Sequence, residues 1–387
     1  MSALQGIRVL ELAESVAGEY CGKLLADFGA EIIKIEKPGS GSPTRALGPF
    51  KDNNPAPEHS GLFAYLNIGK HSVALDLDTA GSTLDTLLAN VDVVIDDHPN
   101  DWLTHHTLTF DRVERDFPAL VFCSITDFGL TPPDDRRHAT DLTVMNSAGW
   151  AYHTPTGADP SRPPLKGAGR FMASYEAGME AAMCISACLC DSSGGRTIEI
   201  SKQEVLLSRL DYVLAQMVSG EMNVSAERDA FDLAGPAGIF ECRDGFAYIW
   251  MSAPSHWQAL RELLDDTTWM NDFPDNWLER GCTAERVTLC RQHLGAWLKT
   301  QNKHDAAARA QQLGLTLVAV NNAEDLLACE QYEYRGFFTE LRHPIIGNAR
   351  YPGTPYQLSK TPTYPQSPAP LLGQHSQHLA TVTGGAL

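Results

Sequence analysis

Apolar and polar residues alternate at the start of the chain in a pattern typical of a strand, a helix and a second strand. The segment GIRVLELA, residues 6–13, is a short apolar run with β-branched residues, and EIIKIEKP, residues 31–38, is another. Between them, apolar side chains recur at helical spacing, at Cys21, Leu24, Leu25 and Phe28. A strand–helix–strand unit of this length predicts two parallel strands joined by a right-handed crossover.

The same alternation continues over the first 130 residues. Strands are predicted at 71–77, 91–97 and 119–129, because each is a short run rich in Val, Ile, Leu or Phe, and a helix is predicted at 81–91. Alternating β and α elements predict an α/β fold with an open, doubly wound parallel sheet.

The texture of the chain changes after this region. Residues 131–172 are rich in Gly, Pro and polar side chains and are expected to form a loop. A long helix of small residues is predicted over 174–190 and a strand over 197–201. One strongly periodic helix is predicted over 202–220.

A second, smaller domain is predicted in the last third of the chain. A β-hairpin is expected over 235–253, turning at Asp244 and Gly245, and helical patterns follow to about residue 312. The segment 336–376 is rich in proline and is expected to run extended over another surface of the protein.

The composition excludes several classes of protein. The 48 acidic and 30 basic residues give a formal net charge of −18, which argues against a nucleic-acid-binding protein because phosphates require a basic surface. No run of eighteen uncharged apolar residues occurs, so no membrane span is predicted. The opening MSALQGIRVLELAES lacks the pattern of a secretory signal, and the expected location is the cytoplasm.

The cysteines and histidines do not predict a metal site. Nine cysteines in a cytoplasmic protein are expected to be reduced thiols. Cys184, Cys188 and Cys190 cluster in one predicted helix, but no second pair of ligands follows at short spacing. The pair His105-His106 also has no partner ligand nearby in the sequence.

Several blocks of sequence follow one another in a fixed order between Gly6 and Gln374. They include GIRVLELAESVAGEYCGKLLADFGAEIIKIEKPGSG, LNIGKHSVALDLDTAGS, VDVVIDDHPNDWL, CSITDFGL, ATDLTVMNSAG, GGRTIEISKQEVLLS and RHPIIGNARYPGTP. Together and in this order they resemble the class III CoA-transferases of the CaiB/BaiF type. That family includes formyl-CoA and carnitine CoA-transferases and the α-methylacyl-CoA racemases.

The resemblance implies a domain organisation and an assembly. It implies a Rossmann-like large domain formed by residues 1–220 together with a C-terminal return at 326–387, with a small domain at 221–325 inserted between them. It also implies an interlocked homodimer, in which the linkers thread the two subunits through each other like rings.

The resemblance also implies the reaction, in which CoA moves from an acyl-CoA to an organic acid. In the family's transferases an aspartate at the start of a small-residue helix attacks the thioester and forms a mixed anhydride. A carboxylate suits this step because it is ionised at neutral pH and is a good leaving group. Coenzyme A enters as the substrate acyl-CoA, and no permanently bound cofactor is expected. In this chain the matching stretch is ASYEAG, so Ser174 stands where the family has aspartate.

This serine leaves three interpretations open. In the first, a nearby carboxylate, Glu176 or Asp141, takes over as nucleophile. In the second, Ser174, activated by His138 or Glu176, carries out acyl transfer or hydrolysis. In the third, the chain binds a CoA-like ligand without a covalent step. Glu176 lies roughly 200° around a helix from Ser174, which disfavours a joint role for the two. Thr140 precedes Asp141 where the racemases have histidine, so racemase chemistry is not favoured.

Ser174 and Asp141 also have purely structural interpretations. Ser174 suits a helix N-cap, and Asp141 suits a cap on the helix that follows it.

The CoA site is expected at the carboxyl ends of the first strands. By resemblance, Val16, Ala17 and Gly18 form the loop under the pantetheine and the thioester. Two lysines, Lys37 and Lys70, match basic positions that contact the nucleotide.

Other positions depart from the family pattern. Asp97 and His98 stand where the family has an asparagine and an aromatic residue beside the adenine, and His105 stands at an arginine position. The acidic pair 96–97 is expected to oppose a polyanionic ligand. Arg137, in a basic cluster next to Asp141, is expected to hold a phosphate or the acceptor carboxylate.

Overall fold

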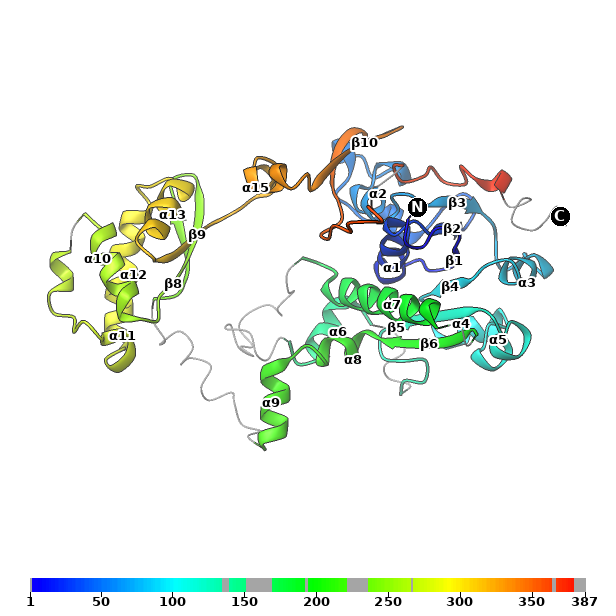
Figure 1. Cartoon of the computed structure of the whole chain (residues 1–387), viewed down its shortest axis with the longest axis horizontal. Helices are drawn as coiled ribbons and strands as arrows, with labels where there is room; N and C mark the ends of the chain where they lie inside the picture. Colours follow the sequence, from blue (N-terminus) through cyan, green and yellow to red (C-terminus); the bar gives the residue numbers. More distant parts are fainter. Residues whose placement is uncertain are drawn as a thin grey trace. The chain divides into compact units, whose positions relative to one another are not determined.

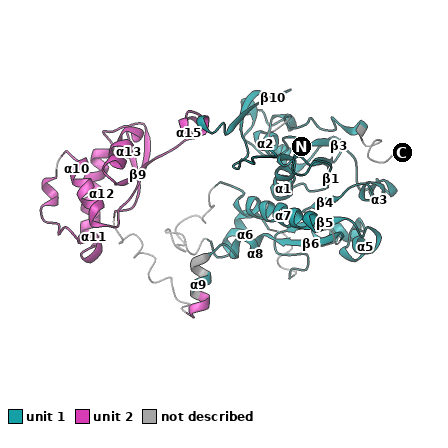
Figure 2. Cartoon of the chain, in the orientation of Figure 1, with its two compact units in different colours: residues 1–152, 160–215, 334–387 teal, residues 153–159, 216–333 magenta. Residues whose placement is uncertain are grey.

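The fold is given by a computed structural model that describes residues 2–133, 139–150, 169–191, 194–220, 236–265, 267–363 and 367–378. The chain divides into two compact units (Figure 2). Unit 1 comprises residues 1–152, 160–215 and 334–387, and unit 2 comprises residues 153–159 and 216–333. Unit 1 is therefore built from both ends of the chain, with most of unit 2 inserted between them.

Unit 1 is built on a six-stranded sheet with the strand order β3-β2-β1-β4-β5-β6 (Figure 1). Every neighbouring pair is parallel, which confirms the predicted α/β class and the parallel sheet. The chain order switches sides between β1 and β4, as in doubly wound folds. The strands are β1 (Arg8–Glu11), β2 (Glu31–Glu36), β3 (His71–Ala74), β4 (Val93–Asp96), β5 (Val121–Thr126) and β6 (Arg196–Ser201).

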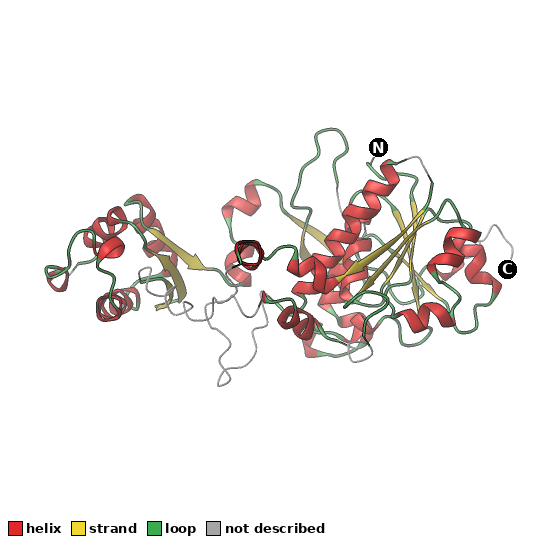
Figure 3. Cartoon of the chain, turned by 90° about the horizontal axis from the view of Figure 1, so that it is seen from below, coloured by secondary structure: helices red, strands yellow, loops and turns green. Residues whose placement is uncertain are grey.

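Helices cover both faces of this sheet (Figure 3), and for that reason most of its strands are nearly continuous apolar runs. One face packs against α1 (Val16–Asp27) and α7 (Met172–Cys190). The other face packs against α3 (Ser82–Leu88), α4 (Asn100–His105) and α5 (Phe110–Asp116). The other α-helices in this part of unit 1 are α2 (Gly61–Leu66), α6 (Asp141–Ser147) and α8 (Lys202–Leu207), and α9 (Asp211–Ser219) runs from unit 1 into unit 2.

The small residues of α7 allow a close approach to α1. A Cβ added to Gly178 would lie only 2.5 Å from the carbonyl oxygen of Ala17, so any larger residue would push the two helices apart. Tyr20 and Tyr175 meet edge to face, with ring centroids 4.7 Å apart. The contact places the start of α7 beside the start of α1.

The periodic segment 202–220 is two helices rather than one. It breaks after Leu207, where the backbone N–H groups of Arg209 and Leu210 donate to carbonyl groups three residues earlier. The side chain of Arg209 turns at this point toward α7 and pairs with Glu176 and Glu180. Hydrophobic periodicity continued through the break, so the sequence pattern did not reveal it.

The proline-rich end of the chain contains a hairpin that the sequence analysis missed. The strands β10 (Phe338–His343) and β11 (Gly347–Pro352) pair antiparallel. Pro344 falls in the turn and Pro352 at the last position of a strand, where the missing N–H costs little. After the hairpin, residues 368–371 have no regular secondary structure and a turn follows at residues 372–375, so the expected extended course is not continuous.

Residues 367–378 lie along β3 at the edge of the sheet. The N–H of His375 donates to the carbonyl oxygen of Ser72 at 2.8 Å, and the N–H of Gly373 donates to the Ser72 hydroxyl at 2.9 Å. The N–H of Leu372 donates to Glu58 Oε1 at 2.9 Å. These contacts attach the end of the chain to its first hundred residues.

Unit 2 has a three-stranded antiparallel sheet and its own core. The hairpin predicted around Asp244 and Gly245 is confirmed as β7 (Gly238–Cys242) and β8 (Gly245–Trp250), and β9 (Thr316–Val320) pairs with β8. Trp257 and Trp277 are fully buried in the core. The helices that follow β8 are α10 (Pro254–Leu263), α11 (Trp277–Arg280), α12 (Ala284–Leu298), α13 (Lys303–Gln312), α14 (Ala323–Leu327) and α15 (Glu330–Tyr334).

Among the described residues, no helix has both the length and the apolar character needed to cross a membrane.

Candidate active site

A cavity of about 1120 Å³ opens at the carboxyl ends of β1, β4 and β5 in unit 1. Doubly wound sheets bind ligands at this place, where the strand order switches sides. The loops that follow the three strands form much of the wall, and the starts of α6, α7 and α8 contribute Asp141, Ser174 and Lys202. The cavity lies where the sequence analysis placed the CoA site.

Asp141 and Ser174 contact each other on the wall of this cavity. The hydroxyl of Ser174 donates to Asp141 Oδ1 at 2.6 Å, and the backbone N–H of Ser174 donates to Oδ2 at 2.9 Å. The carboxylate thus accepts two hydrogen bonds from the first turn of α7 while it stands at the start of α6. Free N–H groups at helix starts stabilise a negative charge, so the position suits an ionised carboxylate.

The N-cap positions predicted for these two residues are wrong. The N-cap of α7 is Phe171, and Ser174 is the third residue inside the helix. The N-cap of α6 is Thr140, whose hydroxyl accepts from the N–H of Thr143. Neither Asp141 nor Ser174 is therefore occupied as the cap of its own helix.

Lys202 adds a positive charge to the cavity wall. It is the first residue of α8, and its ammonium group lies 2.9 Å from Asp127 Oδ1. Burial alone would lower the pKa of Lys202, but the nearby carboxylates, Asp127 first and then Asp141, outweigh this effect and raise it. Lys202 therefore stays protonated at neutral pH and can stabilise negative charge in the cavity.

Asp97 organises the loop after β1. Its carboxylate accepts from the backbone N–H groups of Glu14 and Ser15, both at 2.8 Å, and from the Ser15 hydroxyl. Burial alone would raise the pKa of Asp97, but the charge of His98 and these hydrogen bonds lower it. Asp97 therefore stays ionised, and its charge is stabilised by hydrogen bonds from the loop after β1 and by His98.

A smaller cavity of about 140 Å³ shares Glu14 with the large one. Its wall includes the predicted residues Lys37 and His98, together with Trp102. His98 stacks on Trp102 with ring centroids 3.7 Å apart, and its Nδ1 lies 2.7 Å from Asp96 Oδ1. The smaller cavity thus lies beside the large one and has aromatic and basic side chains in its wall.

His98 gives the protein a specific dependence on pH. Burial alone would lower the pKa of His98, but Asp96 and Glu14 raise it to about 10. The unfolded chain releases this proton near pH 6.5, so the stabilising contribution is complete below about pH 6.5 and is lost as the pH rises toward 10. We expect the free energy of unfolding to fall over that interval in urea titrations followed by circular dichroism.

The His98→Gln variant should lack most of this decline and should already be less stable at about pH 6. The half-buried His59→Gln is the matched control and should follow the unsubstituted protein. An identical decline in His98→Gln and in the control would contradict the assignment.

Lys70 does not line either cavity, in contrast to its predicted contact with the nucleotide. It is buried, with its ammonium group 2.7 Å from Glu11 Oε2 and 2.7 Å from the carbonyl oxygen of Glu19. Lys34 lies 3.1 Å from the other oxygen of Glu11 and 3.0 Å from Glu19. This buried ionic cluster ties β1 and α1 to β2 and to the residue before β3.

The predicted loop residues have different roles. Val16 lines the large cavity, whereas Ala17 and Gly18 pack inside the first turn of α1. A Cβ on Gly18 would lie 2.1 Å from the Cβ of Ala13, so glycine is needed for the tight entry into the helix. Two residues of the cavity walls, Lys202 and Trp102, were not predicted, because their only sequence signals are a lysine directly after a strand and an aromatic residue in a short helix.

The remaining predicted residues lie away from the Asp141–Ser174 pair or outside the described residues. Glu176 pairs with Arg209 at 2.8 Å and does not line the large cavity, in agreement with the helical geometry. His105 is exposed at the end of α4. Arg137 and His138 lie outside the residues that the structure describes.

The chain is similar to known proteins over nearly its whole length. Residues 4–376 match CoA-transferase family III. The mouse protein named succinyl-CoA:glutarate CoA-transferase is 27% identical, over 98% of this chain and 86% of that protein. The succinate–glutarate CoA-transferase of Agrobacterium fabrum is 28% identical, over 96% of this chain and 93% of that protein.

A solved structure shares the fold. The crystal structure of a CAIB/BAIF family protein from Brucella suis superposes with a TM-score of 0.84, at 22% identity and 99% coverage of both chains.

Fold and cavity together define an α/β protein with an open cavity at the switch point of a doubly wound parallel sheet. The chain belongs to CoA-transferase family III. The family resemblance drawn from the sequence blocks is thus confirmed.

Proposed function

We propose that this protein moves CoA from an acyl-CoA to a carboxylic acid, with Asp141 as the nucleophile. The observation that carries the proposal is the position of Asp141. Its carboxylate lies on the wall of the large cavity and is hydrogen-bonded to Ser174, which by resemblance stands where the family has aspartate. The replacement thus leaves a carboxylate within hydrogen-bonding distance of the original position. Of the three interpretations drawn from the sequence, this geometry favours the first, with Asp141 rather than Glu176.

The reaction balances without a proton transfer. A carboxylate oxygen of Asp141 attacks the thioester carbonyl, the C–S bond breaks, and an anhydride and CoA thiolate form. The thiolate attacks the Asp141 carbonyl carbon, the donor acid leaves, and Asp141 carries CoA as a thioester. The acceptor carboxylate displaces the thiolate to form a second anhydride, and the thiolate then attacks the acceptor's acyl carbon. This last step releases the new acyl-CoA and restores the carboxylate.

The same chemistry disfavours Ser174 as the nucleophile. An ester on Ser174 would have to expel an alkoxide to return its acyl group to CoA, and an alkoxide is a much poorer leaving group than a carboxylate. Ser174 is instead a positioning residue, because its hydroxyl and N–H hold both oxygens of Asp141. Once Asp141 is acylated, the same donors face the oxygen on which negative charge develops.

We propose that CoA spans the two cavities. Its thioester would lie beside Asp141 and Val16, and its nucleotide would extend toward Lys37, His98 and Trp102 in the smaller cavity. Glu14 lines both cavities, so they lie next to each other. An aromatic ring and a lysine suit an adenine and a phosphate.

We propose succinyl-CoA as donor and a small dicarboxylic acid as acceptor. Relatives of this chain are named for transfer from succinyl-CoA to glutarate and to mesaconate. The second carboxylate of such a substrate needs a cation, and Lys202 supplies one in the cavity wall.

Trapping of the covalent intermediate tests the proposal. The protein is incubated with succinyl-CoA without acceptor, treated with hydroxylamine and digested with trypsin. We expect a hydroxamate on the peptide that contains Asp141, because anhydrides and thioesters of a carboxylate react with hydroxylamine. Arg170 lies between Asp141 and Ser174, so mass spectrometry separates the two sites.

The matched control is Asp116→Asn, which removes an exposed carboxylate and should keep the label. The Asp141→Asn variant should lose it. An ester found on Ser174, or a label on another carboxylate, would overturn the role given to Asp141.

We further propose that the protein is a cytoplasmic homodimer of the interlocked kind. Met179 and Met183 on α7 are 45% and 58% exposed, which is unusual for large apolar side chains on a long helix of unit 1. A second copy of the chain would cover them. Sedimentation at micromolar concentration should then give twice the mass of one chain, and a monomer would contradict the proposal.

A further inference from the structure

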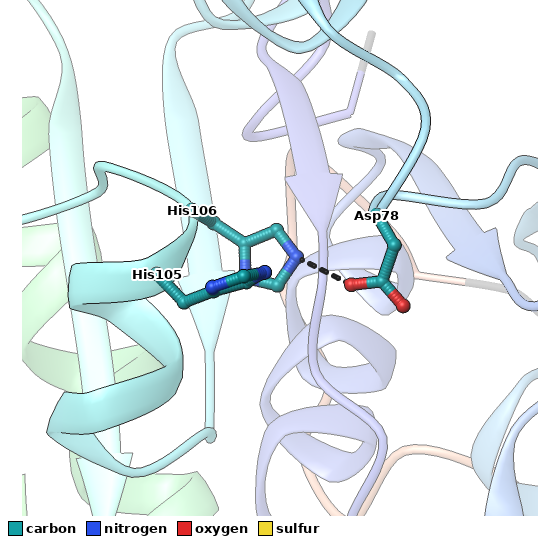
Figure 4. Close-up of side chains that lie close together, drawn as sticks. All are labelled: Asp78, His105 and His106. Carbon is teal, nitrogen blue, oxygen red and sulfur yellow. Dashed lines mark hydrogen bonds and ion pairs between the residues drawn. The ribbon is translucent and has the colours of Figure 1, made fainter.

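A cluster of two histidines and one aspartate lies at the end of α4, apart from the Asp141–Ser174 pair. His105 is the last residue of α4, His106 is its C-cap, and Asp78 comes from the turn after β3 (Figure 4). One ligand atom of each residue lies within 4.8 Å of those of the other two. From the sequence alone the histidine pair had no partner, because Asp78 is distant along the chain.

The backbone at the end of α4 brings the two histidines together. Consecutive residues inside a helix point in different directions, but here the helix stops between them. Thr107 adopts a left-handed conformation with φ of 56°, and Arg112 donates to its carbonyl oxygen at 2.9 Å. The two imidazole rings therefore meet edge to face, with centroids 4.9 Å apart.

The hydrogen bonds of His106 fix which nitrogen is free to bind a cation. Its Nδ1 lies 3.0 Å from the carbonyl oxygen of Trp102, which can only accept, so Nδ1 carries the hydrogen. The Nε2 lone pair of the neutral ring then faces Asp78 Oδ1 at 3.2 Å. Two acceptors face each other stably only if a cation, a proton or a metal ion, lies between them. A histidine whose Nδ1 is held by a carbonyl is also a common arrangement among metal ligands.

We propose that Asp78, His105 and His106 bind a divalent transition-metal ion such as Zn²⁺. Two imidazole nitrogens and one carboxylate oxygen form a ligand set that suits Zn²⁺, Co²⁺ and Ni²⁺ rather than Mg²⁺ or Ca²⁺. The carboxyl end of α4 adds partial negative charge beside the ion. Three protein ligands leave a coordination position open to water or to an anion. His106 also lines the smaller cavity, so the ion would stand at its edge.

The test measures binding of Co²⁺ and Zn²⁺ to the full chain after removal of metals with a chelator. Exposed thiols such as Cys190 are first alkylated, because thiolates bind the same ions. We expect one Co²⁺ per chain, with visible absorption typical of nitrogen and oxygen ligands and without the near-ultraviolet bands of thiolates. Zn²⁺ should displace Co²⁺ from this site.

Variants identify the ligands. His105→Gln and Asp78→Asn change exposed side chains, so they should leave the fold intact and weaken Co²⁺ binding by roughly 10-fold or more. His59→Gln is the matched control and should bind as the unsubstituted protein does. The proposal is overturned if the double variant of His105 and Asp78 binds Co²⁺ unchanged, or if the unsubstituted protein binds none at about 100 μM.

Discussion

Replacement of Asp141 by asparagine lowers kcat/KM for CoA transfer by on the order of 10³-fold or more, while binding of CoA is retained. The amide has the shape of the carboxylate and keeps a hydrogen-bond acceptor for Ser174, so the cavity wall stays intact. It cannot act as an anionic nucleophile, and no anhydride forms. The measurement follows the appearance of glutaryl-CoA from succinyl-CoA and glutarate by liquid chromatography.

The Ser174→Ala variant tests which residue of the Asp141–Ser174 pair is the nucleophile and which one positions it. If Asp141 is the nucleophile, the alanine variant loses one hydrogen bond to the carboxylate but keeps the backbone N–H, and the rate falls by only about 10- to 100-fold. Losses as large as that of Asp141→Asn would instead assign the nucleophile to Ser174. Full activity in Asp141→Asn would exclude a covalent role for Asp141.

The variant Lys70→Met is expected to destabilise unit 1 by about 3 kcal/mol, although Lys70 is remote from the chemistry. Its removal leaves Glu11 in a fully buried position with Lys34 as the remaining cation. Burial already raises the pKa of Glu11 against the effect of both lysines, so the loss of one lysine leaves a poorly compensated charge. Thermal unfolding should begin roughly 5–10 °C lower.

The exposed Lys51→Met is the control for this substitution and should unfold as the unsubstituted protein does. Lys70→Met should also leave the Km for acyl-CoA nearly unchanged in the cold. If the Lys70→Met variant has normal stability and a strongly raised Km for acyl-CoA, the result would support the predicted contact of Lys70 with the nucleotide. It would contradict the stabilising role given to the buried ionic cluster.

Elements with a regular pattern were predictable from the sequence, because local spacing alone defines them. The strands of the parallel sheet, the long small-residue helix and the hairpin at Asp244 and Gly245 all follow from periodicity and turn residues. The break after Leu207 and the hairpin that contains Pro344 were not predictable in this way, because each depends on contacts with other segments. Arg209, for example, reaches two glutamates on α7.

The candidate site was only partly predictable. Asp141 and Ser174 were identified as separate candidates, but their contact requires α6 and α7 to start side by side, which no spacing along the chain encodes. Lys70 was assigned to a ligand because a lysine in a motif suggests a phosphate, whereas its partner Glu11 lies in a buried strand. Acidic residues within β-strands were not considered as partners, so the burial of Lys70 against Glu11 was not predicted.

The attachment of residues 367–378 to β3 has a consequence for synthesis on the ribosome. Unit 1 needs contacts from Leu372, Gly373 and His375 to residues in the first part of the sequence, so it stays incomplete until these residues have been synthesised. Residues 216–333 emerge earlier and carry a core of their own. The inserted unit can therefore fold first. Until residues 372–375 contact Glu58 and Ser72, the N-terminal part of unit 1 remains incompletely folded and accessible to chaperones and proteases.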